Sequence, residues 1–298
     1  MDLAKPSAAS SITIRPLQDV AAYEHFQQLE RRVWGSDAVD IMPVHVLATL
    51  AKNGGLVLGA YDADGPESTG GLVGATLGWL GTGIDPATPD AEPRLKFCSH
   101  MAGVLPDWQG KHVGLRLKLA QREHVLAQGL TDWITWTYDP LFRANGVFNI
   151  HRLGATCTTY LRNLYGEMTD ELNRGAPSDR CQVDWRLTSP HVLHTIASKA
   201  NAERTWSLEI LDILPSRINA AGFDVPSETT LSHDGRPLAV PIPSDISTIR
   251  RADRELSLAW RFYLRSVLEE AFDAGYTMVD CVHLTNHGWH YILVREYL

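Results

Sequence analysis

The sequence has few cysteines, no excess of positive charge and no long apolar run. Its four cysteines are widely spaced and form no C-x-x-C pair, so we expect reduced, partly buried thiols in a cytoplasmic protein. The net charge of −8 argues against general nucleic-acid binding, which needs a basic face. No stretch approaches the apolar length of a membrane span, and we expect neither a membrane segment nor a signal peptide.

The composition that remains is that of a globular enzyme. Of the 298 residues, 44% are apolar and 21% are charged, which suffices for a sizeable core and two structural units. We predict a short flexible leader over residues 1–10. We then predict one domain over 11–188 and a smaller α+β subdomain over 189–298.

Hydrophobic periodicity over the first domain alternates between the periods of strands and helices. It predicts strands over 12–17, 56–61, 72–80, 97–105, 133–137, 156–161 and 182–187. It predicts helices over 20–33, 43–52, 113–128 and 142–153. The order is strand, two helices, three strands, helix, strand, helix and two strands, which indicates an α/β fold.

The C-terminal part has a different pattern. It predicts helices over 190–200 and 257–274, strands over 209–215, 276–279 and 291–294, and polar turns over 223–243. Helix–Gly–strand joins at Gly129 and Gly275 are consistent with a degenerate half-repeat, although such joins are also common by themselves. Trp260-Arg261 stands where the first copy has Gly114-Leu115, so we place no cofactor in the second copy.

The stretch 96–136 carries the main functional signal. An apolar strand ends at Leu105-Pro106, a polar turn over 107–112 follows, and a helical pattern begins at Val113. A glycine-bearing turn that leads from a strand into a helix directs backbone N–H groups and a positive dipole end at one place, where a phosphate can bind. The alternative is an ordinary strand–turn–helix without a ligand.

The sequence of this turn resembles the motif of the acyl-CoA loop in the GNAT (Gcn5-related) N-acyltransferases, Q/R-x-x-G-x-G/A. Gln109 and Gly114 match its ends, while His112 replaces the middle glycine. Gly110, with Val104 and Pro106 before it, fits the common family motif V-x-P…R-G-K-G-I-G. The resemblance covers about residues 12–187 and implies the GNAT fold, a mixed central sheet with splayed strands and flanking helices.

The resemblance also implies an acyl-CoA cofactor, either acetyl-CoA or succinyl-CoA. The cofactor-binding residues that it implies are Ala102, Val104, Gln109, Gly110, Lys111, His112, Val113, Gly114 and Asn149. Basic residues gather around the loop in this acidic chain and would attract a polyanion such as CoA: Lys111, His112, Arg116, Lys118 and Arg122. A solvated basic helix face is the alternative.

Acyl transfer to an amine needs a base, because an ammonium has no lone pair for attack. His100 is the first candidate: it lies on the predicted central strand, on the face of Cys98 and Ala102, and titrates near neutral pH. A histidine satisfied by a backbone carbonyl is the alternative. Asp139, after the fifth strand, is the second candidate, although an Asp before Pro commonly makes a turn.

The family commonly has a tyrosine that acts as the general acid on the helix after the fifth strand, in a motif such as R-F-Y-E-K-L-G-F. The matching stretch is 148–155, in which Ile150 occupies the tyrosine position. Tyr138, Tyr160 and Tyr165 are the nearby alternatives, and we take Tyr165 as the candidate acid, while a packed surface tyrosine is the alternative. Three histidines, His283, His287 and His290, match no standard metal spacing, and we predict no metal site.

Segments 134–141, 153–155, 164–166 and 178–180 resemble a bacterial branch of GNAT-like proteins, some of which are associated with N-succinylation of amino acids. This implies a small amine or amino acid as acceptor, with Arg143, Arg152 or Arg180 as candidates to bind its carboxylate. A homodimer is consistent with this class. The alternative functions are a CoA sensor or interaction protein without catalysis, suggested by His112 and Ile150, and a scaffold that binds no CoA.

Overall fold

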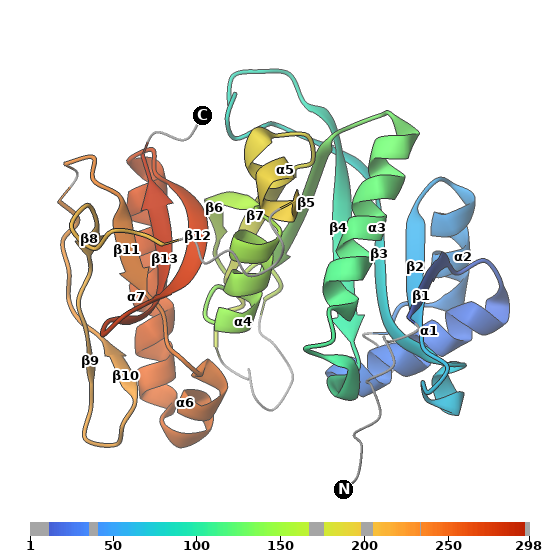
Figure 1. Cartoon of the computed structure of the whole chain (residues 1–298), viewed down its shortest axis with the longest axis horizontal. Helices are drawn as coiled ribbons and strands as arrows, with labels where there is room; N and C mark the ends of the chain where they lie inside the picture. Colours follow the sequence, from blue (N-terminus) through green and yellow to red (C-terminus); the bar gives the residue numbers. More distant parts are fainter. Residues whose placement is uncertain (1–11, 36–40, 167–175, 198–204, 233, 296–298) are drawn as a thin grey trace, which may run out of the picture. The chain divides into compact units, whose positions relative to one another are not determined.

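The computed structural model describes residues 12–35, 41–166, 176–197, 205–232 and 234–295 (Figure 1). The predicted leader at 1–10 lies outside the described residues. The chain divides into two compact units. The first unit holds the chain up to Asp85 and Asp90–Ile134, and the second unit holds Pro86–Pro89 and the chain from Thr135 onward.

The first unit consists of strands and helices in the predicted order. Its elements are β1 (Thr13–Pro16), α1 (Val20–Trp34), α2 (Val44–Lys52), β2 (Leu56–Tyr61), η1 (Glu67–Thr69), β3 (Leu72–Gly83), β4 (Arg94–Val104), η2 (Pro106–Trp108) and α3 (Val113–Gln128). The chain then enters β5 (Trp133–Tyr138), which begins in the first unit and continues in the second. The predicted α/β class is therefore confirmed for this part of the chain.

The four strands β1 to β4 pair in sequence order, each antiparallel to the next. Helices cover both faces of this sheet. A side chain at Gly74 of β3 would meet Val113 and Leu117 of α3, whereas one at Gly103 of β4 would meet Trp34 of α1. Because Gly103 pairs with the residue after Gly74, these two positions point to opposite faces. The sheet is therefore buried between α1 and α3.

Local signals explain where α1 begins and ends. The Asp19 carboxylate accepts a hydrogen bond from the Ala22 N–H at 2.8 Å, which caps the helix N-terminus. Gly35 ends the helix in the left-handed conformation, with φ +61°. Tyr23, Phe26 and Leu29 are buried at helical spacing. The sequence prediction for this helix is confirmed to within one residue.

We expect Gly78→Ala to lower the free energy of unfolding by about 1–3 kcal/mol, because a Cβ at Gly78 would lie 2.5 Å from the Cys98 carbonyl oxygen and 2.4 Å from the Phe97 ring. Gly81→Ala, on the same strand, is the matched control, since a Cβ there meets no atom within 4 Å. Urea unfolding of both variants measures the difference. Equal stabilities would contradict the packing described here.

The second unit continues from β5 with more strands and helices. They are α4 (Arg143–Gly146), a π-helix, η3 (Val147–Arg152), β6 (Thr156–Leu161), β7 (Arg180–Arg186), α5 (Pro190–Ala197), β8 (Asp212–Ile213), β9 (Ser216–Ile218), β10 (Asp224–Pro226), β11 (Leu238–Pro241), α6 (Ile246–Ala252), α7 (Arg254–Asp273), β12 (Thr277–Leu284) and β13 (Gly288–Val294). Its sheet has the order β5-β7-β6-β12-β13-β11-β8, while β9 and β10 pair separately. The sheet is mixed, because β8 runs parallel to β11 whereas β12 and β13 are antiparallel.

The structure of this unit differs from the sequence predictions at several places. The helix predicted over 142–153 is a short α-helix followed by the π-helix. The polar turns predicted over 223–243 contain β11, whose four residues are all buried. The prolines around that segment suggested a loop. Pro241, however, is the last residue of β11, and this strand pairs with β13. Helix α6 was not predicted at all. The predicted helix 190–200 ends at Ala197, and its last residues lie outside the described ones.

The compact units divide within β5 rather than at the predicted boundary near residue 188. The reason is that the C-terminal part packs onto the segment 135–188. Strand β12 pairs with β6 through Met278 and Cys157. The Tyr291 hydroxyl donates to the Pro140 carbonyl at 2.9 Å. The predicted C-terminal subdomain is therefore built together with the chain that precedes it.

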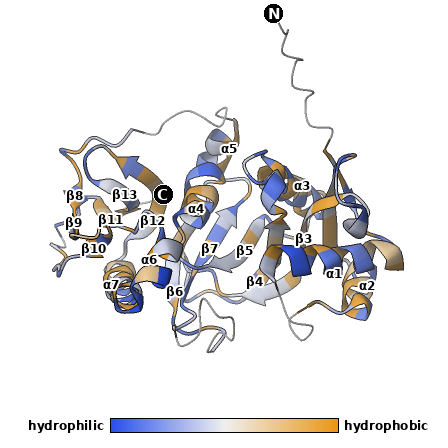
Figure 2. Ribbon diagram, turned by 90° about the horizontal axis from the view of Figure 1, so that it is seen from below, coloured by the Kyte–Doolittle hydropathy of each residue, from blue (hydrophilic) through white to orange (hydrophobic). Residues whose placement is uncertain are grey.

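Helix α7 is amphipathic, with both hydrophobic and hydrophilic turns visible in Figure 2. Its buried residues include Leu256, Trp260, Leu264 and Leu268 at intervals of four. The join to β12 passes through Gly275 with φ +83°, as Gly129 joins α3 to β5 with φ +66°. Trp260 and Arg261 lie inside α7, not in a loop, because that helix already begins at Arg254. The half-repeat stays a prediction.

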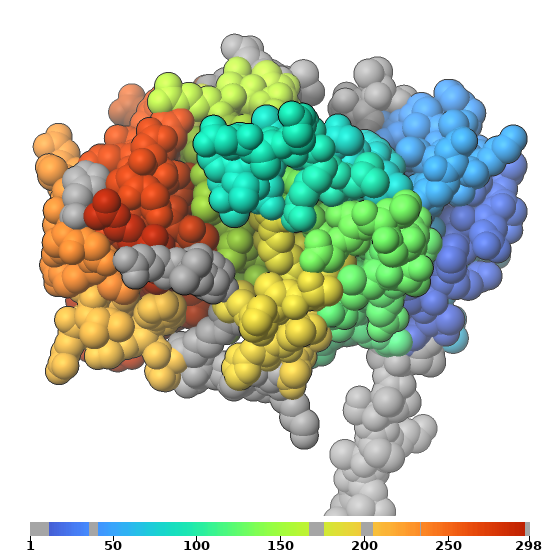
Figure 3. Space-filling model, turned by 90° about the horizontal axis from the view of Figure 1, so that it is seen from above, coloured from blue at the N-terminus to red at the C-terminus, as the bar shows by residue number. Residues whose placement is uncertain are grey.

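The surface seen in Figure 3 includes α5, drawn in yellow, whose Leu193 is exposed. Among the helices in the described part of the chain, none combines the length and apolar composition that crossing a membrane requires.

Candidate functional site

Strand β4 contains a β-bulge at His100. Gly78 of β3 pairs with Ser99, and the preceding residue Leu77 pairs with Met101, so His100 is an extra residue without a partner position. A bulge leaves the N–H of the extra residue outside the regular ladder and re-aims its side chain. Such a position can supply a backbone N–H donor to an anion.

The bulge corrects the predicted face of the strand. Ala102 pairs with Thr76, on the α3 side of the sheet, whereas Cys98 pairs with Trp79 on the opposite side. The two residues therefore do not share a face, because one inserted residue reverses the alternation. The His100 ring packs against the Trp79 ring, with centroids 5.2 Å apart. Burial lowers the pKa of His100, so its imidazole is neutral at pH 7.

The turn between β4 and α3 has an unusual backbone. Gly110 has φ +75° and His112 has φ +59°, and residues 109–112 are exposed. Glycine adopts this left-handed region without strain, and histidine is among the few other residues enriched there. His112 stands where the resembled motif has its middle glycine. Its backbone nevertheless has a conformation that glycine favours. The predicted strand–turn–helix is confirmed as a structure.

The N-terminus of α3 offers backbone donors. Its first hydrogen bond runs from the Arg116 N–H to the His112 carbonyl. The N–H groups of Val113, Gly114 and Leu115 consequently have no partner inside the helix. These groups and the helix dipole of α3 point at the turn, where they favour an anion.

Side chains hold this turn in place. The Trp108 indole N–H donates to the Asp62 carboxylate at 3.1 Å, and the Gln109 amide donates to the Val104 carbonyl at 3.1 Å. Lys111 lies over the Trp108 ring, with its Nζ 5.4 Å from the ring centroid. The turn is thus anchored from β4 and from the segment after β2, while its backbone stays exposed.

The predicted basic cluster is smaller than expected. Lys118 is not on a solvated face, since it is only 2% exposed. Its ammonium donates to the Ser99 hydroxyl at 2.8 Å and to the Gln121 amide oxygen at 3.3 Å. Burial lowers the pKa of Lys118 to about 7. The guanidinium of Arg116 is engaged by the Ile12 carbonyl. Lys111 and His112 remain exposed beside the loop.

Asp139, a candidate base, lies in the second unit inside an ion-pair cluster. Its Oδ2 is 2.6 Å from Arg261 Nη2 and 3.3 Å from Arg250 Nη2, and 3.9 Å from Arg180 Nη1. Its Oδ1 accepts from the Leu141 N–H at 2.9 Å. Burial alone would raise the pKa of Asp139, but these guanidinium groups and the N–H outweigh it and hold the pKa below its ordinary value. A carboxylate held in this way is a weak base.

Tyr165, the candidate acid, lies in the same unit at the edge of this cluster. It is 57% exposed, its hydroxyl is 2.9 Å from the Thr137 hydroxyl, and the Arg180 guanidinium lies 5.3 Å from its ring centroid. Arg180 therefore contacts both predicted residues, the carboxylate of Asp139 and the ring of Tyr165.

Burial disfavours the other two tyrosines as acids. It raises the pKa of Tyr138, whose hydroxyl donates to the Met278 sulfur, and that of Tyr160, whose hydroxyl donates to the Asp179 carboxylate. A phenol with a raised pKa gives up its proton less readily.

Asn149 lies on the π-helix of the second unit. Its side-chain oxygen accepts a hydrogen bond from the Trp136 indole N–H at 3.1 Å, and the residue is 5% exposed. Ile150, at the place where the family has its tyrosine, is fully buried.

The three C-terminal histidines lie on or beside β12 and β13. His283 packs on Trp289, and His290 is buried, with Nδ1 3.2 Å from the Gly288 carbonyl. Burial lowers the pKa of His290 to about 4. Within the described residues, no group of three or more His, Cys, Asp or Glu side chains is arranged to hold a metal ion.

Sequence reasoning missed the burial of Lys118 and the roles of Arg250 and Arg261. Lys118 lies one helical turn from Gly114. Its burial becomes clear only when it is known which side of α3 packs on the sheet. Arg261 appears in a helical pattern where an arginine is ordinarily solvated, and its pairing with Asp139 spans 122 residues. Its position among buried apolar residues at intervals of three or four was the one available signal.

These features define an α/β protein with a candidate anion-binding turn between β4 and α3. Neither a family model nor a curated protein matches its sequence. Solved structures similar to the chain include Arabidopsis thaliana NAA60 in complex with a bisubstrate analogue, at 12% identity and a TM-score of 0.47, over 59% of this chain and 97% of that one.

A second similar structure is the ribosomal-protein-S18-alanine N-acetyltransferase from Escherichia coli, at 15% identity and a TM-score of 0.43, over 60% of this chain and 95% of that one. A third is an N-acetyltransferase from Staphylococcus aureus Mu50, at 14% identity and a TM-score of 0.42, over 60% of this chain and 99% of that one.

Proposed function

We propose that the chain is an acyl-CoA-dependent N-acyltransferase of the GNAT type, which moves an acetyl or succinyl group from CoA to the amine of a small molecule such as an amino acid. The observation that carries the proposal is the exposed turn 109–112, with positive φ at Gly110 and His112, directly before α3. Its sequence resembles the family loop, and its exposed backbone leads directly into the N-terminus of α3, where an anion can bind. The bulge at His100 supports the proposal independently.

In this proposal the pyrophosphate of CoA accepts hydrogen bonds from the N–H groups at the start of α3, and Lys111 adds positive charge beside them. A backbone N–H at the β4 bulge would stabilise the oxyanion of the tetrahedral intermediate. His100, neutral at pH 7, would take the proton from the attacking amine. The CoA thiol is a tolerable leaving group with a pKa near ~8.5, so a general acid helps without being required.

Asp139 is not part of this mechanism, because Arg261 and Arg250 hold its carboxylate. Tyr165, which lies in the second unit, stays the acid that the sequence predicts. The N-succinylation of amino acids and a homodimer stay proposals that follow from the sequence resemblance.

Thermal unfolding with acetyl-CoA, succinyl-CoA and free CoA tests the cofactor. A ligand at about 100 times its Kd stabilises the folded state by about 2.7 kcal/mol, which raises Tm by several degrees. A larger shift with one ester than with free CoA would identify the donor. No shift with any of the three would contradict the proposal.

We expect Gly114→Glu to abolish this stabilisation, because it places a carboxylate where the pyrophosphate would bind. The Tm without ligand shows whether the fold is kept. His112→Gly is the matched control in the same turn, since glycine keeps the left-handed backbone and removes only a side chain. Retained CoA affinity in Gly114→Glu, or its loss in His112→Gly alone, would speak against the backbone site.

A CoA sensor without catalysis is the second candidate, because the family tyrosine is replaced by the buried Ile150. Release of free thiol from an acyl-CoA on addition of an amine separates the two functions. Amine-dependent thiol release excludes the sensor, whereas CoA binding without release across a panel of amines favours it.

A further inference from the structure

Four buried polar side chains lie between helix α3 and strands β3 and β4. They are Lys118 and Gln121 of α3, Thr76 of β3 and Ser99 of β4, and each residue is at most 2% exposed. All four belong to the first unit, and we call them the β4 network. Burying a polar group without a partner is costly, so such groups in a core ordinarily hydrogen-bond one another.

Hydrogen bonds join the β4 network into one chain. The Lys118 ammonium donates to the Ser99 hydroxyl at 2.8 Å and to the Gln121 amide oxygen at 3.3 Å. The Gln121 amide nitrogen donates to the Thr76 hydroxyl over a longer distance, 3.5 Å. The Thr76 hydroxyl in turn donates to the Met101 carbonyl at 2.8 Å. The chain of hydrogen bonds therefore begins at Ser99 and ends at the backbone of Met101.

These two ends flank the bulge in β4. Ser99 and Met101 pair with successive residues of β3, and the extra residue His100 stands between them. The β4 network thus holds both neighbours of His100 from the α3 side of the sheet. On the opposite side the His100 ring packs on the Trp79 ring, with centroids 5.2 Å apart. A bulge interrupts the regular ladder of backbone hydrogen bonds, so side-chain hydrogen bonds to both of its neighbours help to fix its geometry.

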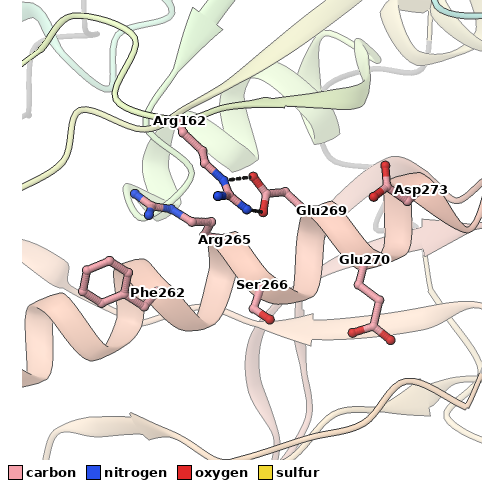
Figure 4. Close-up of a pocket in the computed structure, with 7 residues that line it drawn as sticks. All are labelled: Arg162, Phe262, Arg265, Ser266, Glu269, Glu270 and Asp273. Carbon is pink, nitrogen blue, oxygen red and sulfur yellow. Dashed lines mark hydrogen bonds and ion pairs between the residues drawn. The ribbon is translucent and has the colours of Figure 1, made fainter.

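The charged groups around a hollow on α7 of the second unit show the contrast (Figure 4). This hollow has a volume of about 400 Å³, and in it Arg162 forms a two-pronged ion pair with Glu269. The Arg162 side chain is 64% exposed, and an exposed ion pair of this kind contributes little to stability. The β4 network is shielded from water, so its hydrogen bonds hold the backbone more firmly.

We propose that Lys118 is a positioning residue for acyl transfer, which fixes the bulge at His100 through the β4 network. The bulge carries the backbone N–H that serves as oxyanion donor and the imidazole that serves as base, so this inference rests on the proposed function. Lys118 itself touches no reacting atom and acts through Ser99. Because it contacts both Ser99 and Gln121, its loss breaks the chain of hydrogen bonds in the middle.

The first test compares NMR signals of the whole chain without ligand, those of the His100 ring and of the His100 and Met101 N–H groups. We expect them to move in Lys118→Met and in Ser99→Ala, which removes a single oxygen and serves if Lys118→Met does not fold. Val125→Ala is the matched control, because it truncates a buried apolar side chain of the same helix. Unchanged signals in the folded network variants, or equal changes in Val125→Ala, would overturn the proposal.

The second test is thiol release from acetyl-CoA with an amine that the wild-type protein accepts. In Lys118→Met we expect kcat to fall by about 10²-fold, the effect of losing one oxyanion donor. The Kd for acetyl-CoA should stay close to that of the wild type, because Asp62 and Val104 hold the turn 109–112. An unchanged kcat in folded Lys118→Met would overturn the positioning role. If the wild-type protein binds no acetyl-CoA, the proposed function fails, while the NMR comparison still decides whether Lys118 fixes the bulge.

Discussion

Wild-type protein is expected to gain stability relative to Lys118→Met as the pH rises from 7 to 9.5, by about 1.4 kcal/mol per pH unit, or about 3 kcal/mol in all. The reason is the burial of the Lys118 ammonium, which lowers its pKa from 10.5 to about 7. Between these two values the unfolded chain holds a proton at Lys118 that the folded chain does not. Raising the pH therefore favours the folded state.

Below pH 7 the stability difference between the two proteins no longer changes with pH. Both folded and unfolded chains then carry the charge, and the folded state bears the full cost of burying it. Methionine keeps much of the side-chain volume and cannot titrate, although it leaves the Ser99 hydroxyl and the Gln121 amide without their ammonium partner.

Urea unfolding at several pH values measures this difference. Lys52→Met is the matched control, because it removes a lysine that lies exposed at the end of α2. If the wild-type and Lys118→Met stabilities ran parallel over this range, Lys118 would not be buried as described.

Asp139→Asn is expected to lower the free energy of unfolding at neutral pH by about 3–5 kcal/mol. Removing one partner of a buried ion pair leaves the remaining charges uncompensated, and here it leaves Arg261, Arg250 and Arg180 around a neutral amide. The folded-state pKa of Asp139 lies below its ordinary value of 3.8. The deficit is therefore fully present above about pH 4 and shrinks as the pH falls through the folded-state pKa.

Urea unfolding at pH 7 and at pH 3 measures this deficit. Asp234→Asn is the control, because Asp234 forms an exposed ion pair with Arg236 and no comparable loss is expected there. The same variant separates two roles of Asp139. A protein with wild-type stability that has lost turnover would indicate a catalytic base and not a structural anion.

The strand–turn–helix at residues 97–128 was predictable because its signals are local. Pro106 follows the strand, Gly110 supplies a positive φ, and Gly129 ends the helix, so each element is specified by residues within a few positions. The same holds for the cap at Asp19. These signals fix φ and ψ at single residues and do not depend on which segment packs nearby.

The bulge at His100 and the burial of Lys118 were not predictable in this way. The bulge is a relation between two strands, since it exists only in the pairing of Ser99 and Met101 with Gly78 and Leu77. The burial of Lys118 depends on which side of α3 meets the sheet. A basic residue at a helical position is ordinarily solvated, so the pattern favoured the wrong side.

The sequence by itself determined the α/β class, the order of elements over residues 12–187 and the turn before α3, because periodicity and caps act over a few residues. Only the tertiary structure decided that Asp139 belongs to an arginine cluster and that the C-terminal part packs on the segment 135–188. Arg250 and Arg261 lie 111 and 122 residues from Asp139 in the chain. Nothing in the local sequence of either partner encodes such a pairing, which arises when α6 and α7 pack in the second unit.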